Sequence, residues 1–427
     1  MLDLKRLRQD PEGVRAALAR RGDATLGPAL DRALELDRRR RDLLVRTESL
    51  KAERNAASDE VARLKRARQP ADELVARLKA SGDEVRALDG EVRDVEAELD
   101  RIMLEMPNLP HPGVPDGGAE SNRVLRAWGE PPALDFAPRP HWELGVSLGL
   151  FDLPAGAKIT GSGFPLFAGV GARLVRALAS FMLDLHTTEH GYLEIAPPYL
   201  VNRATLTGTG QLPKFADEVY TVEADELFLI PTAEVPVTNL YRGEIIDGAA
   251  LPMGFAAYTP CFRREAGAHG KDTRGLIRVH QFDKVELVRL TRPEDSDAEH
   301  ERLTAHAETV LQRLELPYRA VELAAGDTGF ASARTIDLEV WAPGVGAWLE
   351  VSSSSTFTDF QARRADIRYR AAAGARPEFV HTLNASGVAF PRTIIGILEN
   401  HQAVDGSVRV PGALVPYLGQ ERLTPRA

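Results

Sequence analysis

The sequence reads TPCFRREAG from Thr259 to Gly267 and LIRVHQFDKVE from Leu276 to Glu286, and a loop rich in glycine and charged residues joins the two runs. The flanks of this loop alternate or run apolar, which predicts two antiparallel strands with a long flexible loop between them. Arginine can bind a phosphate or a carboxylate through two parallel hydrogen bonds, a carboxylate can hold an amine, and an aromatic ring such as Phe282 can stack on a base. Together these groups suit a nucleotide and an amino acid that meet on the floor of a sheet.

The first hundred residues differ from the rest of the chain in composition. They contain 22 basic and 22 acidic side chains but none of the 27 aromatic residues, the first of which is Trp128, and only 3 of the 28 prolines. A segment with so much charge and no aromatic side chain cannot build a thick core. It is therefore a long helix, a coiled coil or a disordered region.

A heptad repeat decides among these three alternatives. Apolar residues recur in steps of three and four, with Ser81 as the one polar member, a pattern typical of a coiled-coil seam. The seam consists of Ala71, Leu74, Leu78, Ser81, Val85, Leu88, Val92, Val95, Leu99, Ile102 and Met106. A weaker repeat precedes it, and the sequence QPAD at 69–72 separates the two. We therefore expect an antiparallel helical hairpin over about 27–106, preceded by a short helix at 11–18.

Proline residues mark the end of the hairpin. Four prolines and a glycine fall within 107–115, a composition typical of a linker. Beyond it, residues 116–427 contain all the aromatic side chains and are numerous enough to bury a sizeable mixed core. We therefore expect an N-terminal helical part over 1–106, a linker over 107–115 and a second domain over 116–427.

Basic residues crowd the expected tip of the hairpin. Between Glu60 and Asp72 the chain has four basic side chains and no acidic one: Arg63, Lys65, Arg66 and Arg68. Such a run is either a solvated helix face or an arm that binds phosphates and gains affinity by releasing counterions condensed on a nucleic acid. The run alone does not decide between these two interpretations.

Properties of the whole chain exclude several classes of protein. The net charge is −9, which argues against a globally basic nucleic-acid coat protein. The single cysteine, Cys261, excludes a disulfide framework and a cysteine-rich zinc site. The sequence has no apolar run of about 18 residues that could span a membrane. Because the first residues are also too charged for a signal peptide, we expect a cytoplasmic protein without a membrane segment.

The run from Phe262 to Glu286 resembles motif 2 of the class II aminoacyl-tRNA synthetases, and more narrowly that of the seryl-tRNA synthetase family. Other segments resemble this family in the same order: GYLEIAPP at 191–198 its motif 1, TAEVP at 232–236 its serine-binding loop, and NASGVAFPR at 384–392 its motif 3. The resemblance extends over nearly the whole chain and includes the hairpin. It implies an α+β fold, in which helices flank an antiparallel sheet and an antiparallel α-helical coiled-coil arm precedes it.

The resemblance also implies roles for individual residues toward ATP. Arg263 would hold the α-phosphate and the attacking carboxylate, and Arg392 would hold the γ-phosphate, so these two would be the catalytic residues. The residues expected to bind ATP are Arg263, Arg264, Glu265, Val279, Phe282, Glu350, Val351, Ser352, Ser353 and Arg392. Glu350 and Ser353 would also hold Mg²⁺ together with the ATP, since Mg²⁺ prefers oxygen ligands. The structural alternatives are an ion pair beside the strand for Arg263 and Glu265, and a core aromatic residue for Phe282. For Arg392 the alternative is an arginine that caps a helix, and for the serines at 352–355 a polar turn.

For the amino acid, the resemblance implies a pocket that binds L-serine. The residues expected to line it are Thr232, Ala233, Glu234, Glu286 and Ser386. Thr232 and Glu234 would receive the amine, and the last two residues would contact the hydroxyl. A site built around a hydroxyl rejects the analogue that lacks it, because its buried partners would stay unpaired. His186 and His190 lie four residues apart on one expected helix face without a third ligand, which favours a structural role, and the resemblance implies no zinc.

The reaction implied by the resemblance joins L-serine to tRNA. Serine and ATP would give seryl-adenylate and pyrophosphate, and the seryl group would then pass to the 3′ end of tRNA(Ser); tRNA(Sec) stays open as a second substrate. The family also implies a homodimer formed through the motif 1 region. Its arm would reach the long variable arm of the tRNA, in which case the tRNA-binding residues would be Arg63, Lys65, Arg66 and Arg68.

Two other classes of function stay open. One is a paralogue that activates an amino acid for a carrier protein, and the presence of the hairpin argues against it. The other is a non-catalytic coiled-coil protein that binds RNA or serves as a scaffold; the combination of Arg263, Glu265, Glu286 and Arg392 argues against this class. The chain departs from the family in motif 3, where Pro391 fixes φ and removes one N–H donor beside Arg392.

Overall fold

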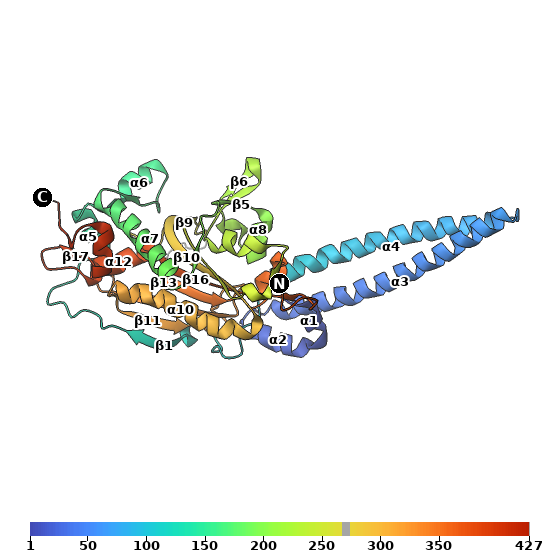
Figure 1. The fold of residues 1–427 in the computed structure, drawn as a ribbon, viewed down its shortest axis with the longest axis horizontal. Helices are drawn as coiled ribbons and strands as arrows, with labels where there is room; N and C mark the ends of the chain where they lie inside the picture. Colours follow the sequence, from blue (N-terminus) through green and yellow to red (C-terminus); the bar gives the residue numbers. More distant parts are fainter. Residues whose placement is uncertain (267–273, 427) are drawn as a thin grey trace. The chain divides into compact units, whose positions relative to one another are not determined.

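The computed structural model of the chain describes residues 1–266 and 274–426. The chain forms two compact units (Figure 1). The helical unit consists of Leu2–Ala19 and Asp23–Pro107, and the core unit consists of Met1, Arg20–Gly22 and Asn108–Ala427. Within the described residues, none of the helices combines the length and the apolar character that a membrane span requires.

The helical unit contains two short helices and a long hairpin. Its helices are α1 (Leu4–Gln9), α2 (Pro11–Ala19), α3 (Leu26–Arg66) and α4 (Asp72–Glu105). The expected short helix and hairpin are thus confirmed, whereas the sequence pattern did not predict α1. The side chain of Asp3 caps α1 by accepting a hydrogen bond from the backbone N–H of Lys5.

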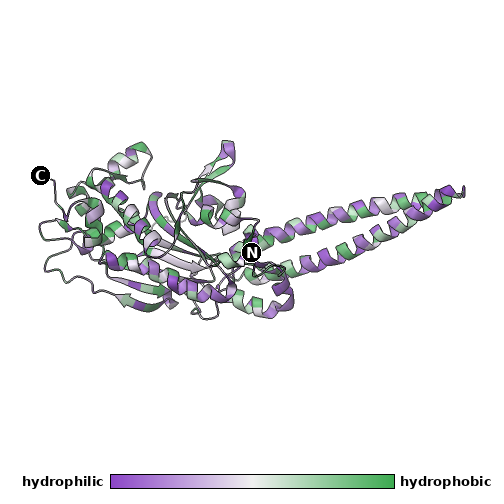
Figure 2. Cartoon of the chain, viewed as in Figure 1, coloured by the Kyte–Doolittle hydropathy of each residue, from purple (hydrophilic) through white to green (hydrophobic). Residues whose placement is uncertain are grey.

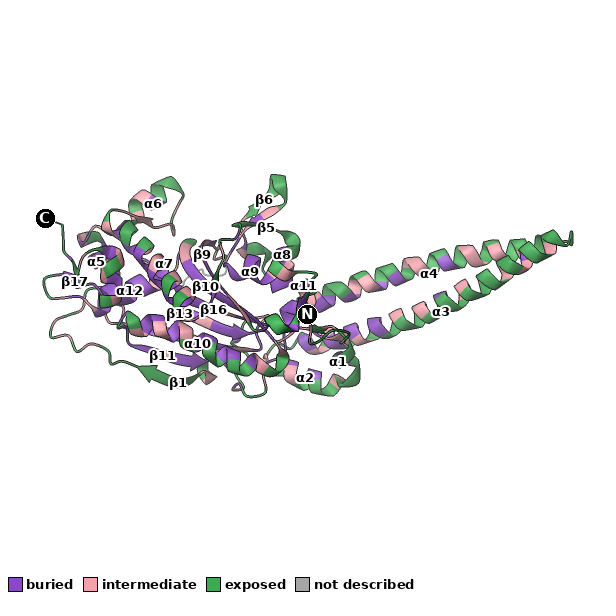
Figure 3. Ribbon diagram, in the orientation of Figure 1, coloured by how far each residue is buried: buried purple, intermediate pink, exposed green. Residues whose placement is uncertain are grey.

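The heptad seam of α4 packs against α3. Seam residues from Val85 to Met106 are buried, whereas Leu74, Leu78 and Ser81 near the tip are half-buried (Figure 3). Hydrophilic residues dominate the remaining surface of both helices (Figure 2). Ion pairs join α3 to α4 with residue numbers that rise along one helix and fall along the other: Arg32–Glu98, Arg39–Glu91 and Arg46–Glu84. This order shows that the two helices are antiparallel.

An eight-stranded sheet forms the centre of the core unit. Its order is β1-β11-β12-β13-β16-β10-β9-β4, and neighbouring strands are antiparallel except for β4 and β9. The strands are β1 (Arg123–Trp128), β4 (Leu193–Glu194), β9 (Met253–Phe262), β10 (Gln281–Thr291), β11 (Tyr318–Glu322), β12 (Arg334–Ala342), β13 (Ala347–Thr356) and β16 (His381–Ala389). The expected antiparallel sheet is therefore confirmed.

Shorter strands and nine α-helices complete the described part of the core unit. The smaller sheets pair β2 (Phe151–Asp152) with β3 (Leu166–Phe167), β5 (Leu200–Asn202) and β6 (Thr221–Val222) with β7 (Leu227–Leu229), β8 (Ile245–Asp247) and β15 (Glu378–Phe379) with β14 (Arg368–Arg370), and β17 (Val408–Arg409) with β18 (Arg422–Leu423). The helices are α5 (His141–Ser147), α6 (Leu153–Ile159), α7 (Val170–Thr188), α8 (Arg203–Thr209), α9 (Glu234–Thr238), α10 (Ser296–Arg313), α11 (Phe360–Ala365), α12 (Phe390–Asn400) and α13 (Val415–Leu418).

The three motifs adopt the expected local structures. Strands β9 and β10 pair antiparallel, with Glu286 opposite Ala257, and the centre of the loop between them, 267–273, lies outside the described residues. Motif 1, at 191–198, follows the end of α7 at Thr188 and contains β4, which is only two residues long. Motif 3 is β16 followed directly by α12. These elements bring one end of β10, β13 and β16 to the start of α12.

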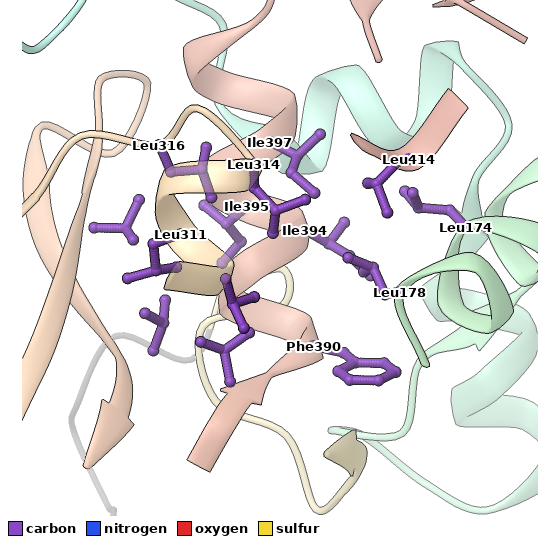
Figure 4. Close-up of a cluster of buried hydrophobic side chains, with 14 of the residues drawn as sticks. Leu174, Leu178, Leu311, Leu314, Leu316, Phe390, Ile394, Ile395, Ile397 and Leu414 are labelled. Carbon is purple, nitrogen blue, oxygen red and sulfur yellow. The ribbon is translucent and has the colours of Figure 1, made fainter. Parts of the chain in front are cut away.

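Buried aliphatic side chains fix this arrangement. The largest core cluster joins α7, α10 and α12, and its members include Leu178, Leu311, Ile394 and Phe390 (Figure 4). All four are 1% exposed or less, so the start of α12 is anchored in the core. Helix α12 therefore holds Arg392, which lies in its first turn, at a fixed position.

Candidate active site

The first cavity of the core unit lies between β9, β10, β13 and the start of α12 and has a volume of about 190 Å³. Its lining residues are Arg263, Glu265, Leu276, Ile277, Arg278, Val279, Phe282, Lys284, Glu350, Val351, Ser386, Ala389, Pro391 and Arg392. Seven of the residues expected to bind ATP are in this set: Arg263, Glu265, Val279, Phe282, Glu350, Val351 and Arg392. The topology thus brings residues of motif 2, β13 and motif 3 to one cavity.

Arg263 follows directly on β9 at the wall of this cavity. Its backbone N–H donates to the carbonyl of His280 at 2.8 Å, and its Nε donates to the carbonyl of Pro231 at 3.3 Å. The guanidinium carbon lies 5.1 Å from the centre of the Phe282 ring, within the range of a cation–π contact. These contacts hold the positive charge of Arg263 beside an aromatic face.

Glu265 and Arg278 form an ion pair across the two sides of the loop. Glu265 has a φ of 51°, in the left-handed region that residues with a Cβ rarely adopt. Strained backbone of this kind persists where the surrounding contacts hold it, and it is enriched at functional sites. The Arg278 ion pair is one such contact.

Arg392 closes the cavity from the first turn of α12. Its Nε donates to the carbonyl of Ile277 at 3.0 Å, and its Nη1 lies 2.8 Å from the carbonyl oxygen and 3.3 Å from Oε2 of Glu350. Pro391 precedes it within the first turn of the helix, where the backbone N–H has no helical acceptor and proline is favoured. The departure from the family in motif 3 therefore fits the local structure.

A second cavity, of about 670 Å³, adjoins the first and shares part of its wall. The residues that line both cavities are Arg263, Glu265, Arg278, Lys284, Glu350 and Ser386. Four residues expected to bind serine line the second cavity: Thr232, Glu234, Glu286 and Ser386. Ser353 also lines it.

Two buried carboxylates define the polar end of the second cavity. Glu286 of β10 lies opposite Ser386 of β16 in the sheet register and forms an ion pair with Lys284. Glu234, at the start of α9, accepts a hydrogen bond from Nε2 of Gln361 at 2.6 Å. The hydroxyl oxygen of Thr232 accepts from the backbone N–H of Glu234 at 3.2 Å.

Burial raises the pKa of both carboxyl groups. Desolvation, with the nearby charge of Glu286, raises the pKa of Glu234 from 4.5 to about 7. Desolvation also raises the pKa of Glu286, although Lys284 opposes this shift. Because a cation would offset the desolvation of these carboxylates, the cavity is suited to an ammonium group.

A half-buried carboxylate, that of Asp337, lies beside Ser353. Asp337 of β12 is the register partner of Ser353 in β13. Burial raises the pKa of Asp337 well above its usual value, and the charge of Glu350 adds to the effect. Its Oδ1 atom is buried and has no hydrogen-bond partner within the described residues. Asp337 and Ser353 thus form an oxygen-rich corner on β12 and β13. Strand β13 also contains Glu350, which lines both cavities.

Three of the expected site residues line neither cavity within the described part of the chain. The side chain of Arg264 is exposed, and its backbone N–H donates to the carbonyl of Glu218. Ala233 belongs to a hydrophobic cluster, and the hydroxyl of Ser352 donates to the carbonyl of Ser386 at 2.5 Å.

The basic residues of the hairpin belong to the helical unit. Arg63, Lys65 and Arg66 lie in the last turn of α3, and Arg68 follows it with a φ of 55°. All four side chains are exposed. Arg63 forms an ion pair with Glu60 at 2.5 Å.

Sequence reasoning missed several residues of the site. Lys284 lines both cavities, and its spacing from Phe282 and Glu286 places all three on one face of a strand, a signal that was available. Gln361 comes from a segment that carried no motif, and Asp337 lies in the segment TIDLEVW at 335–341, which resembles the family but gave Asp337 no role. Only the tertiary structure brings them to Glu234 and to Ser353.

A buried His–Glu pair supports the end of the motif 2 loop. Nδ1 of His141 lies 2.9 Å from Oε1 of Glu399, and Nε2 of His141 accepts a hydrogen bond from the backbone N–H of Leu276 at 3.0 Å. Gly275 has a φ of 65°, and a Cβ there would lie 2.2 Å from His141 Nε2. The close approach therefore requires glycine.

His186, His190 and His306 form a cluster of histidines. His186 lies in α7, whereas His190 lies just beyond the end of this helix at Thr188, so the two do not share one helix as expected. Their Nδ1 atoms are 3.0 Å apart, and the ring of His190 stacks on that of His306. Within residues 1–266 and 274–426, no three His, Cys, Asp or Glu side chains are arranged to hold a metal ion.

Comparisons with known proteins show which family the chain resembles. The tRNA synthetase class II core domain (G, H, P, S and T) matches residues 219–401, and the seryl-tRNA synthetase N-terminal domain matches residues 1–110. The serine–tRNA ligase of Gemmatimonas aurantiaca is 56% identical over 98% of this chain and 99% of its own length. That of Geobacter sulfurreducens is 54% identical with the same coverage.

Solved structures give the same result. The crystal structure of seryl-tRNA synthetase from Pyrococcus horikoshii complexed with ATP covers 100% of both chains at 38% identity, with a TM-score of 0.95. The cytoplasmic serine–tRNA ligase of Naegleria fowleri in complex with AMP is 27% identical over 100% of this chain and 99% of its own, with a TM-score of 0.88. The chain therefore belongs to the seryl-tRNA synthetase family.

Proposed function

We propose that the chain is a serine–tRNA ligase, which activates L-serine with ATP and transfers the seryl group to the 3′ end of tRNA(Ser). The observation that carries this proposal is the pair of adjoining cavities, which share Arg263 on their common wall. One cavity suits a nucleotide and the other a small amino acid with an amine and a hydroxyl. The α-phosphate and the carboxylate would therefore meet at a fixed positive charge.

The amino-acid end of the site selects serine by its polar groups. The buried carboxylate of Glu234 pairs with the serine ammonium, and the Thr232 hydroxyl accepts a hydrogen bond from the backbone N–H of Glu234. Glu286 and Ser386 face each other across two strands and contact the serine hydroxyl. Alanine would leave these buried groups unpaired, and threonine would have to fit an additional methyl group.

The nucleotide end of the site holds ATP for an in-line attack. Phe282 stacks on the adenine, Arg263 binds the α-phosphate, and Arg392 binds the γ-phosphate. A serine carboxylate oxygen attacks the α-phosphorus, the bond to the bridging oxygen breaks, and pyrophosphate leaves with the electron pair. Positioned cations lower the barrier because they stabilise charge on the phosphates as it develops.

Mg²⁺ fits the oxygen-rich corner beside these residues. Glu350 and Ser353 offer oxygen ligands, and the unpartnered buried Oδ1 of Asp337 adds a further acceptor nearby. Mg²⁺ usually binds through one or two carboxylates together with substrate phosphates. When bound with ATP, it would offset the negative charge of the phosphate groups.

The second half of the reaction uses tRNA. The terminal ribose hydroxyl attacks the acyl carbon of seryl-adenylate, the acyl–phosphate bond breaks, and AMP leaves.

The exposed basic residues at the tip of the hairpin contact phosphates of the long variable arm of tRNA(Ser), and tRNA(Sec) is a candidate second substrate. The active form is a homodimer built on the motif 1 region, and the protein acts in the cytoplasm.

Serine-dependent exchange of pyrophosphate into ATP tests the activation step. The purified chain is incubated with ATP, Mg²⁺ and labelled pyrophosphate, and each of the standard amino acids is added in a separate reaction. We expect exchange with serine and far less with alanine or threonine. A folded protein that shows no exchange with serine, or equal exchange with alanine, would contradict the proposal.

A further inference from the structure

Arg21 contacts a loop that is far from it in the sequence. It belongs to Arg20–Gly22, three residues of the core unit whose chain neighbours on both sides belong to the helical unit. Its Nη1 donates to the carbonyls of Thr328 at 2.7 Å and Gly329 at 3.0 Å, and its Nη2 donates to the carbonyl of Ser332 at 2.6 Å. Nε and Nη2 donate to the carbonyl of Asn108 at 3.1 and 2.8 Å.

Asn108 completes the set of hydrogen bonds. Its backbone N–H donates to the carbonyl of Phe330 at 2.9 Å, and its Nδ2 donates to the carbonyl of Ala331 at 3.0 Å. Arg21 and Asn108 together therefore hold five consecutive carbonyls, those of residues 328–332. This segment has no regular secondary structure, so the donors of Arg21 and Asn108 take the place of a strand ladder.

The same segment forms one wall of the amino-acid cavity. Gly329, Phe330, Ala331 and Ser332 all line the cavity that contains Glu234 and Glu286. Because the carbonyls of the segment are bound to Arg21 and Asn108, its backbone position is fixed by residues outside the cavity. The width of the cavity at this wall depends on those hydrogen bonds.

Arg21 holds the wall without a carboxylate partner. Within the described residues it forms no ion pair, and burial lowers the pKa of its guanidinium to about 10. A partly buried cation is costly unless its donors are satisfied. The planar fork of arginine can reach three or more acceptors at once, which the single ammonium group of lysine cannot do with the same geometry.

We propose that Arg21 is a positioning residue that fixes the 328–332 wall of the amino-acid cavity and thereby sets the affinity for serine. The inference rests on the proposed function, since the cavity is taken to bind serine. Arg21 contacts neither substrate and acts through the backbone of the wall. Its loss should widen the cavity, so serine binds more weakly and threonine is excluded less well.

Arg21→Ala and Arg21→Lys test the proposal, with Arg20→Ala as a matched control. Arg20 is adjacent and also binds backbone carbonyls, those of His111 and Val114, but none in the wall. Pyrophosphate exchange gives the KM for serine and for ATP in each folded variant. We expect Arg21→Ala to raise the KM for serine about tenfold or more with the KM for ATP within about twofold, and Arg21→Lys to raise the KM for serine by less than the alanine variant but by more than about twofold.

Several outcomes would overturn the inference. A KM for serine within about twofold of wild type in folded Arg21→Ala, or in Arg21→Lys if the alanine variant does not fold, would show that Arg21 does not control the wall. An equal increase in Arg20→Ala, or equal increases for serine and ATP, would indicate general destabilisation instead. Wild-type protein without serine-dependent exchange would contradict the proposed function, which separates that failure from a failure of this inference.

Discussion

Replacing Glu234 with glutamine should make the ligand-free protein more stable at high pH while weakening its affinity for serine. Glu234 is buried, its Oε1 accepts a hydrogen bond from Gln361, and burial raises its pKa from 4.5 to about 7. Glutamine can keep the hydrogen bond through its own Oε1. It removes the buried charge that the empty cavity must accommodate.

The sign of the effect follows from proton linkage. Between pH 4.5 and about 7, folded Glu234 keeps a proton that the unfolded chain has released, so the free energy of unfolding falls as the pH rises through this window. A shift of this size corresponds to a cost of about 3 kcal/mol once the pH exceeds the folded pKa. The stability of Glu234→Gln relative to wild type should therefore rise by about 2–3 kcal/mol between about pH 5 and about pH 8.

Urea unfolding followed by tryptophan fluorescence measures this difference. All 4 tryptophans lie in the core unit, so the signal reports the part of the chain that contains Glu234. Glu223→Gln, at an exposed position, serves as the control and should show no such change. If the difference between Glu234→Gln and wild type were the same at both pH values, or smaller at the higher one, the assignment of a buried, uncompensated carboxylate would be wrong. The variant should also raise the KM for serine at the higher pH, because the ammonium group loses its partner.

Four further predictions concern other parts of the chain. Arg263→Ala should lower serine-dependent exchange by roughly 10²–10³-fold with an unchanged melting temperature, and exchange within a few-fold of wild type would contradict its role. Glu286→Ala should reduce the ratio of kcat/KM for serine to that for alanine from about 10⁴, and an unchanged ratio would place hydroxyl recognition elsewhere. Replacing 57–78 with a short turn should preserve exchange but sharply lower charging of tRNA, and full charging by this deletion variant would make the arm a structural element only. Neutralising the four basic residues of the tip should reduce the slope of log affinity for tRNA against log salt concentration by about 0.7–0.9 per lost phosphate contact. His141→Asn, which loses the acceptor for Leu276 N–H, should raise the KM for ATP more than His141→Gln, which keeps an acceptor near Nε2, and equal values for both would argue against this hydrogen bond.

Periodic patterns made much of the fold predictable. The heptad repeat predicted α4 almost to its ends, because burial along a two-helix seam follows local spacing. The alternating runs around the motif 2 loop predicted β9 and β10, because burial along a strand also follows the local spacing of apolar residues. Helix α1 was missed, since six residues, three of them basic, give too short a pattern and its cap at Asp3 is a single residue.

The candidate site was predictable only where a motif carried it. Residues of motifs 2 and 3 lie together because adjacent strands and the following helix place them there. Gln361 and Arg21 have no local signature, and their contacts depend on packing between segments far apart in the sequence. Arg21, for example, reaches Gly329 across 308 positions of the chain, a distance at which spacing gives no information.

The identity of the amino acid that the chain attaches to tRNA tests the central claim most directly. The full-length protein is incubated with ATP, Mg²⁺, unfractionated bacterial tRNA and an equimolar mixture of the standard amino acids, and the aminoacyl-adenosine released from the tRNA 3′ ends is identified by mass. The account predicts seryl-adenosine as the dominant product, formed on tRNAs that have a long variable arm. No aminoacyl-adenosine from a folded protein, or a product that carries another amino acid, would contradict it.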